Sequence, residues 1–150
     1  MLPKYHAFYG FIFSAILFIL FPEITLLNTL IIWAASILID VDHYLFYVVS
    51  KKDISLRNAH KWFIEENKKF MKLSYKERLN IKDQIPCIFH GIEALIVLFI
   101  LSYFSSTFFY IAIGFIFHEI LDFIFLIYNG FTLKHLGSQT YNILKYRKII

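Results

Sequence analysis

The sequence has little of what small soluble domains use to hold a core together. Its one cysteine, Cys87, excludes a disulfide framework and a zinc site built on cysteines, so we interpret it as a small buried apolar residue. Charged residues make up only 17 % of the 150 residues, whereas 59 % are apolar. A soluble domain of this size cannot bury that much hydrocarbon, and a disordered chain is poor in aromatic residues, of which this one has 20 %. The composition predicts a single membrane domain.

Several signatures of common enzyme classes are also missing. We find no glycine-rich phosphate-binding loop and no Ser/His/Asp or Cys/His arrangement that would indicate a nucleophilic triad. There is no internal repeat of solenoid length and no low-complexity segment. Any chemistry must therefore come from other residues.

Four long stretches carry few or no charges. They run over about residues 5–22, 26–49, 85–104 and 108–128. An α-helix needs roughly 20 residues to cross a hydrocarbon core of about 30 Å, so each is a candidate span. Short connections join the stretches in pairs. The predicted fold is all-α: an integral membrane four-helix bundle made of two transmembrane hairpins.

The basic residues predict the topology. All fifteen Lys and Arg lie at Lys4, in the loop 51–84 or in the tail 129–150, and the two short turns contain none. By the positive-inside rule, both termini and the loop are cytoplasmic, in a multi-pass protein of the cell or inner membrane. Topology and anionic lipid headgroups explain the net charge of +4, so we expect no nucleic-acid partner.

The loop 51–84 is predicted to be partly helical and interfacial. Ser74 and Glu77 have the spacing of a capping box, which starts a helix at Tyr75. Apolar side chains among its lysines suit a segment lying on the headgroups; they are Trp62, Phe63, Phe70, Met71 and Leu73. A plain solvated basic loop is the alternative.

The ionisable residues inside the predicted spans are the strongest indication of function in the sequence. Each costs about 2.5–3.5 kcal/mol near the middle of a membrane, so such residues indicate a functional site. They are His6, Asp40, Asp42, His43, His90, Glu93, His118, Glu119 and Asp122. Counted at 1.5 Å per residue, most lie roughly 10–17 Å below the cytoplasmic helix ends. Four helices are thus expected to offer histidines and carboxylates to one layer.

The spacing of these residues is typical of a metal site. His118 and Asp122 are four residues apart and share a helix face, one turn after Gly114, which would let a neighbouring helix approach. Two further pairs are three residues apart: Asp40 with His43, and His90 with Glu93. Asp42 points elsewhere unless the helix unwinds there. Imidazole and carboxylate without thiolate favour Zn²⁺, with Mn²⁺ or Fe²⁺ next, over copper.

Two of these motifs resemble a known family. Asp40-Val41-Asp42-His43 resembles the Asp-x-Asp-His signature of the YdjM-type membrane-bound metal-dependent hydrolases, and the segment Gly114–Asp122 resembles their Gly-x-x-x-His-x-x-x-Asp helix. His6 and His90-Gly91 match two further histidines in the same order. The chain departs from the pattern at Ile39, where the family has proline, and lacks one histidine, for which His60 or Glu93 would substitute.

The resemblance extends more distantly to zinc-dependent phospholipase C and P1-type nucleases, and it implies phosphoester chemistry. We therefore expect a membrane-bound metal-dependent hydrolase that cleaves a phosphoester or pyrophosphate, on a lipid-linked substrate, through a metal-activated water. Asp42, as ligand or water-orienting base, and Asp40 are the expected catalytic residues. The expected metal ligands are His6, Asp40, Asp42, His43, His90, Glu93, His118 and Asp122.

The basic loop is expected to hold the substrate's anionic headgroup, through Lys51, Lys52 and Arg57. Two alternatives belong to other classes of protein. An ion or proton transporter would place polar groups at staggered depths through the membrane. A structural subunit would hold a buried His/Asp network that binds no metal.

Overall fold

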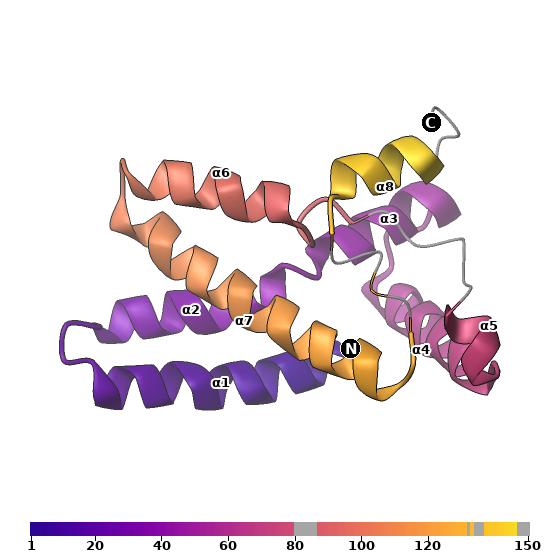
Figure 1. Cartoon of the computed structure of the whole chain (residues 1–150), viewed down its shortest axis with the longest axis horizontal. Helices are drawn as coiled ribbons and strands as arrows, with labels where there is room; N and C mark the ends of the chain where they lie inside the picture. The colour runs from indigo at the N-terminus through magenta and orange to yellow at the C-terminus, as the bar shows by residue number, and fades with distance from the viewer. Residues whose placement is uncertain (80–86, 132, 134–136, 147–150) are drawn as a thin grey trace.

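The predicted all-α class is confirmed. Figure 1 shows the chain as a computed structural model, which describes residues 1–79, 87–131, 133 and 137–146. All regular secondary structure in these residues is helical. The helices are α1 (Pro3–Leu20), α2 (Leu26–Leu38), α3 (Val41–Lys51), α4 (Leu56–Lys72), α5 (Tyr75–Leu79), α6 (Ile92–Ser102), α7 (Ser106–Tyr128) and α8 (Gln139–Tyr146).

Three helical units among the described residues are long and apolar enough to cross a membrane. They are Pro3–Leu20, the unit Leu26–Lys51 that joins α2 to α3, and Ser106–Tyr128. These bounds are close to three of the four predicted spans, and they are compatible with a membrane protein.

The third predicted span, over 85–104, differs from the prediction. Its helix α6 has 11 residues and a length of about 16 Å, too short to cross a hydrocarbon core by itself. Residues 87–91 ahead of it are described as non-helical, and residues 80–86 lie outside the described part. Gly91, the residue before the helix, has extended backbone and no side chain to cap it.

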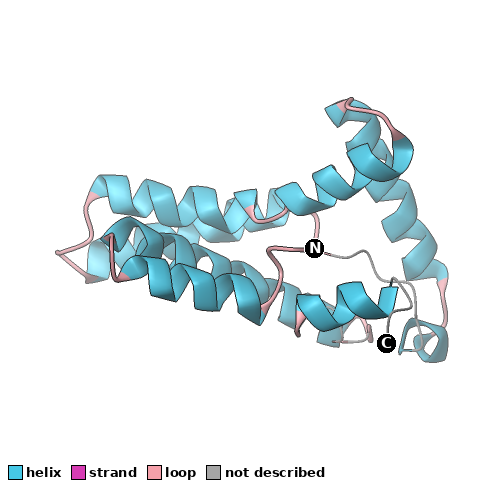
Figure 2. Ribbon diagram, turned by 90° about the horizontal axis from the view of Figure 1, so that it is seen from above, coloured by secondary structure: helices cyan, strands magenta, loops and turns pink. Residues whose placement is uncertain are grey.

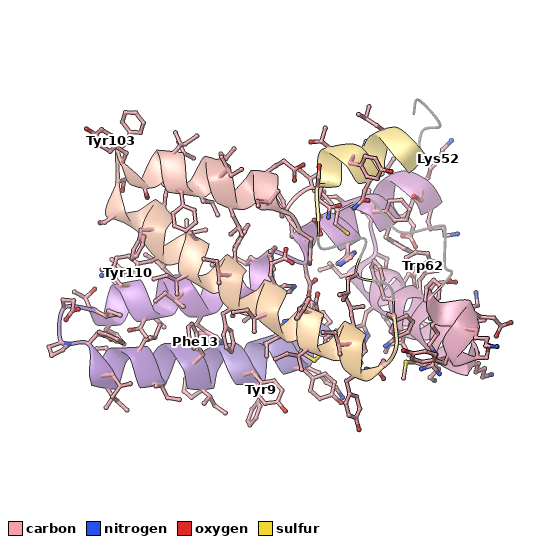
Figure 3. The ribbon with its side chains drawn as sticks, in the orientation of Figure 1. Tyr9, Phe13, Lys52, Trp62, Tyr103 and Tyr110 are labelled. Atoms are coloured by element: carbon pink, nitrogen blue, oxygen red, sulfur yellow. The ribbon has the colours of Figure 1, made fainter. Side chains whose placement is uncertain are left out.

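The elements divide between two ends of the molecule. The turn between α1 and α2 and the turn between α6 and α7 lie at one end, while the N-terminus, α3, α4, α5 and α8 lie toward the other (Figure 1). Figure 2 shows the long helices side by side at the turn end. Tyr103, 91 % exposed, marks that end in Figure 3, and Lys52 and Trp62 mark the opposite one.

Helix α7 is the central element of the packing. It packs most extensively on α2 and also contacts α1 and α6. Gly114 brings α7 and α2 together, because a Cβ atom at this position would lie 2.5 Å from the carbonyl oxygen of Ile32 and 2.7 Å from Ala35 Cβ. The close helix approach expected at Gly114 is therefore confirmed. Gly10 plays the same part between α1 and Ser36 of α2.

The second span is broken at Asp40. Its N–H donates to the carbonyl of Ile37 at 3.3 Å, three residues back, instead of continuing the α-helical pattern to Ser36. The turn separates α2 from α3 and releases the Ser36 carbonyl from its helical partner. It also changes the direction of the Asp40 and Asp42 side chains relative to one straight helix.

The loop helices follow local capping signals. The Ser55 hydroxyl accepts from the N–H of Asn58 at the start of α4. The predicted capping box is confirmed, since Glu77 accepts from the backbone N–H of Ser74 at 2.7 Å and the Ser74 hydroxyl accepts from the Glu77 N–H at 3.4 Å. The Ser74 hydroxyl also donates to Glu77 Oε2 at 2.6 Å, and this bond, followed by the one from the Ser74 N–H, lowers the pKa of Glu77.

The aromatic side of α4 faces the protein. The ring centroid of Trp62 lies 5.6 Å from that of Tyr47 on α3, and that of Phe63 lies 5.8 Å from the His43 ring. Two of the five apolar side chains predicted to lie on lipid headgroups, Trp62 and Phe63, therefore pack on α3. The contact of α4 with headgroups stays a prediction.

We predict that Gly114→Ala destabilises the protein by roughly 1–3 kcal/mol, because the new methyl group meets the α2 backbone. Reversible unfolding in detergent, followed by circular dichroism, measures the change. Ile120→Ala is the matched control on α7, since Ile120 is 48 % exposed. Equal stability of Gly114→Ala and wild type would contradict the packing described here.

Candidate metal centre

Five of the predicted ligands converge from separate parts of the chain. His6 comes from the first turns of α1, Asp40 from the break between α2 and α3, His90 from the segment ahead of α6, and His118 and Asp122 from α7. The three imidazoles are at most 1 % exposed. Within the described residues, His6, His118 and Asp122 form one close group of donor atoms, and Asp40, His90 and His118 form another.

The donor atoms are separated by the distances found within a coordination shell. His90 Nε2 lies 3.1 Å from His118 Nε2 and 3.3 Å from Asp40 Oδ1. Asp122 places Oδ2 3.4 Å from His118 Nε2 and Oδ1 3.2 Å from His6 Nε2. Ligand bonds of about 2.0–2.2 Å at octahedral to tetrahedral angles separate neighbouring donors by about 2.8–3.6 Å. The cluster therefore has the dimensions of a metal site.

Two of the imidazoles are oriented by hydrogen bonds from Nδ1, the ring nitrogen that points away from the cluster. His118 Nδ1 lies 2.8 Å from the Ser36 carbonyl oxygen, which accepts its hydrogen, and His90 Nδ1 lies 3.1 Å from Asp42 Oδ2. With both Nδ1 atoms acting as donors to these acceptors, the two Nε2 atoms carry lone pairs. Two lone pairs facing each other at 3.1 Å repel unless a cation or proton lies between them.

Metal-binding histidines are commonly oriented by a carboxylate or backbone carbonyl on the far nitrogen. Asp42 fits this part for His90, and its Oδ2 also accepts the Phe89 N–H at 2.9 Å. Asp42 was expected as a ligand or water-orienting base. In the structure, its Oδ2 contacts His90, and through His90 it is connected to the centre.

Several buried polar atoms at the centre have no hydrogen-bond partner. They are both ring nitrogens of His6, Asp40 Oδ2 and Asp42 Oδ1, although His6 Nε2 lies 3.2 Å from Asp122 Oδ1 without the geometry of a hydrogen bond. Leaving a buried polar atom unpaired costs about 1–3 kcal/mol, and more for a charged group. A proton on His90 would relieve the contact between the Nε2 atoms but would leave His6 Nδ1 without a partner. The donor set therefore fits a divalent cation better than it fits a closed hydrogen-bond network.

Little positive charge from the chain offsets the carboxylates. Among the described residues, the only cationic groups within 4.0 Å of Asp40, Asp42 and Asp122 are imidazoles and the amino group of Met1, which lies 2.6 Å from Asp122 Oδ1. Two buried carboxylates, Asp42 and Asp122, and the largely buried Asp40 have no described Lys or Arg partner, which favours a cation at this position.

His43 lies at the edge of the cluster. Its side chain is 29 % exposed, and its Nε2 is 3.5 Å from Asp40 Oδ1. The other ring nitrogen, Nδ1, lies 3.4 Å from the sulfur of Cys87.

Glu93 is placed outside the cluster, unlike in the predicted ligand set. Its carboxylate accepts hydrogen bonds from the Ser138 hydroxyl and from the N–H groups of Gln139 and Thr140, at 3.0 and 3.2 Å. It thereby holds the start of α8, and the Gln139 side chain donates to the His90 carbonyl. Glu93 thus supports the His90 backbone instead of facing the metal donors. Glu119, left out of the predicted set, has a buried Oε1 with no hydrogen-bond partner.

A pocket of about 350 Å³ adjoins the cluster. Asp40, His43 and Asp122 line it at the cluster, and the first residues of the chain, α4 and Phe125 provide the other walls. The α4 residues on this pocket include Phe63 and Phe70, so its walls are largely apolar. His60, predicted as one possible replacement for the missing histidine, is exposed and lines the pocket. No Lys or Arg is among the described residues that line it, so Lys51, Lys52 and Arg57 are not placed there.

Comparison with known proteins adds no further assignment: no family model, curated protein or solved structure matches the chain. The geometry of the described residues is therefore the evidence for the site.

Sequence reasoning missed three parts of this site. The Ser36 carbonyl has no sequence signal, because any residue supplies one. The contact of Cys87 with His43 depends on a non-helical segment meeting α3. The position of α4 against the pocket had a partial signal in its aromatic side chains, which we interpreted as facing lipid headgroups.

We predict that Asp42→Asn weakens metal binding by about 10–100-fold, the usual effect of removing the carboxylate behind a ligating histidine. Competition with a chromophoric chelator measures the affinity. Asp53→Asn is the matched control, because Asp53 accepts from the Tyr47 hydroxyl and from Ser55 and Asn58 outside the cluster. These bonds, that of Tyr47 first, lower the pKa of Asp53. Unchanged affinity in Asp42→Asn would contradict the role given to Asp42.

Proposed function

We propose that the protein is an integral membrane metal-dependent hydrolase, with its metal held by His6, Asp40, His90, His118 and Asp122. The observation that carries the proposal is the set of histidine and carboxylate donors arranged at coordination distances, among which both His6 ring nitrogens and Asp40 Oδ2 have no hydrogen-bond partner. Zinc is the proposed metal, with manganese or iron next, because the central donors are imidazole and carboxylate. Membership of the YdjM-type family stays a prediction that rests on the motifs.

We propose a phosphoester or pyrophosphate on a lipid as the substrate. When bound, the metal would polarise a phosphoryl oxygen and activate a water for attack on phosphorus. Asp42 would keep His90 oriented, and Glu93, through the start of α8, would hold the backbone at His90. His43 lines the pocket beside Asp40 and is partly exposed, so it would contact a substrate bound there.

The pocket favours an amphiphilic substrate. Phe63, Phe70 and Phe125 give it apolar walls, while the cluster supplies the polar contacts at one side. Because no described Lys or Arg lines it, the anionic group would bind at the metal, and the basic loop would act only on the membrane surface outside. The transporter alternative requires polar groups at staggered depths, and their collection in one cluster supports the hydrolase.

We further propose the two-hairpin orientation with both termini and the loop 51–84 in the cytoplasm. The absence of Lys and Arg from both turns supports it. From Ser106 to His118, α7 advances about 18 Å, which would put the centre roughly 12 Å inside the cytoplasmic edge of a core of about 30 Å. A lipid headgroup would reach this depth from the side. The segment 85–104 would cross as the fourth span, with α6 as its helical part.

The proposal predicts that purified protein carries a stoichiometric divalent transition metal and releases phosphate from lipid phosphoesters. His118→Ala and Asp122→Ala should each lose most of the metal, because each removes a donor from the cluster. Metal is measured by mass spectrometry, and phosphate release is measured on liposomes that contain phosphatidic acid or a prenyl diphosphate.

His60→Ala is the matched control, since His60 lies on the pocket outside the metal cluster. It should keep the metal. If the wild-type protein stays metal-free after reconstitution at neutral pH, the proposal is wrong. The alternative of a structural subunit with a buried His/Asp network would then be favoured. If the protein binds a full equivalent of metal but hydrolyses no lipid phosphoester, the proposed reaction is wrong and the proposed metal centre stands.

The orientation predicts opposite labelling of two cysteine variants. Lys52→Cys should react with a membrane-impermeant thiol reagent only in inverted vesicles, and Tyr103→Cys only in right-side-out vesicles, because the two residues lie at opposite ends (Figure 3). Cys87 is 1 % exposed and should stay unlabelled, which makes the wild type the control. Labelling of both variants from the same side would exclude the two-hairpin topology.

A further inference from the structure

We propose that Cys87, His43 and Asp42 form a second cation site, with a thiolate ligand, beside the first centre. The inference goes beyond the proposed function, which assigns no role to the cysteine. It also revises the interpretation of Cys87 as a small apolar filler. The sulfur lies 3.4 Å from His43 Nδ1 and 3.8 Å from its Nε2, and Cys87 is 1 % exposed.

The second observation is the free oxygen of Asp42. Oδ2 of this carboxylate is used by His90 and by the Phe89 N–H, whereas Oδ1 is buried and has no hydrogen-bond partner. One donor atom each from Asp42, His43, Cys87 and His90 lie within 4.8 Å of one another. Asp42 is only 4 % exposed, so water does not readily replace the missing partner.

The sulfur–nitrogen distance fits shared coordination. Zinc–sulfur and zinc–nitrogen bonds of about 2.3 and 2.05 Å at a tetrahedral angle place sulfur and nitrogen about 3.6 Å apart. The observed separation between Cys87 Sγ and His43 Nδ1 is 3.4 Å. Because the sulfur is nearly as close to Nε2, at 3.8 Å, the His43 ring has to turn so that its Nδ1 lone pair faces the shared position.

The two nitrogens of His43 would then have separate partners. Nε2 faces Asp40 Oδ1 at 3.5 Å, so a hydrogen on Nε2 points to a carboxylate of the first centre. Nδ1 keeps its lone pair for the second ion. His90 is not counted as a ligand here, because its Nδ1 hydrogen is directed to Asp42 and its Nε2 faces His118. Asp42 and His43 would thus join the two sites.

The ligands determine which ion binds. A thiolate favours Zn²⁺, Co²⁺ or Fe²⁺ over Mn²⁺ and Mg²⁺, whereas the first centre has no sulfur. Binding converts the thiol to a sulfur–metal bond and releases its proton to solvent, with no change of oxidation state. The competing arrangement is a thiol–imidazole hydrogen bond without an ion, which would leave Asp42 Oδ1 unpaired.

The test is X-ray absorption and cobalt substitution of the full chain. Zinc-loaded wild type should bind two equivalents and show a sulfur neighbour at about 2.3 Å. Cobalt-loaded wild type should show a thiolate-to-cobalt charge-transfer band in the near ultraviolet. Cys87→Ser should keep one equivalent and lose both signals. Ser14→Ala, at another small residue that is 1 % exposed, is the matched control and should keep both.

The outcomes separate this inference from the proposed function. One equivalent of metal with no sulfur neighbour in the wild type would overturn the second site and leave the first intact. A sulfur signal that persists while His118→Ala changes neither metal content nor activity would overturn the proposed hydrolase centre and support the thiolate site. Absence of any bound metal would overturn both. If Cys87→Ser does not fold, the wild-type spectra alone still show whether sulfur is bound to the metal.

Discussion

The hydrogen bond between His118 Nδ1 and the Ser36 carbonyl is the contact on which the site depends. It exists because the helix breaks at Asp40, which releases that carbonyl, and because Gly114 lets α7 approach α2 closely enough to reach it. The same bond directs His118 Nε2 toward His90 and Asp40. The break in the second span and the absence of a side chain at Gly114 thus orient a histidine of the candidate metal centre.

The ends and breaks of helices gather at the level of the cluster. Helix α1 begins three residues before His6, α6 begins two residues after His90, and the α2–α3 unit breaks at Asp40, whereas α7 continues past His118. Irregular backbone at membrane depth is tolerated where it is buried in protein or lines a cavity. Here the irregular segments surround the polar cluster and the pocket beside it, so the same local breaks supply both donors and access.

The outer elements connect this cluster to the surface of the molecule. Helix α4 packs aromatic residues on α3 and forms part of the pocket wall. The predicted basic loop therefore lies next to the site, although none of its described Lys and Arg side chains lines the pocket. Helix α8 is tied to Glu93 and to the His90 carbonyl. Glu93, predicted as a ligand, and the aromatic residues of α4, predicted to contact lipid, therefore stabilise the segments that carry the candidate metal donors.

Much of the fold followed from patterns along the chain, because apolar length, capping spacing and a small residue on a helix face are local properties. They predicted the all-α class, three spanning units close to their observed bounds, the start of α5 and the approach at Gly114. The five clustered donors were also all among the predicted ligands, since ionisable residues in apolar helices stand out. Only the tertiary structure showed the break at Asp40, the hydrogen bonds of Glu93 with the start of α8 and the contact of Cys87 with His43. Each of these depends on contacts between segments far apart in sequence, which no local periodicity records.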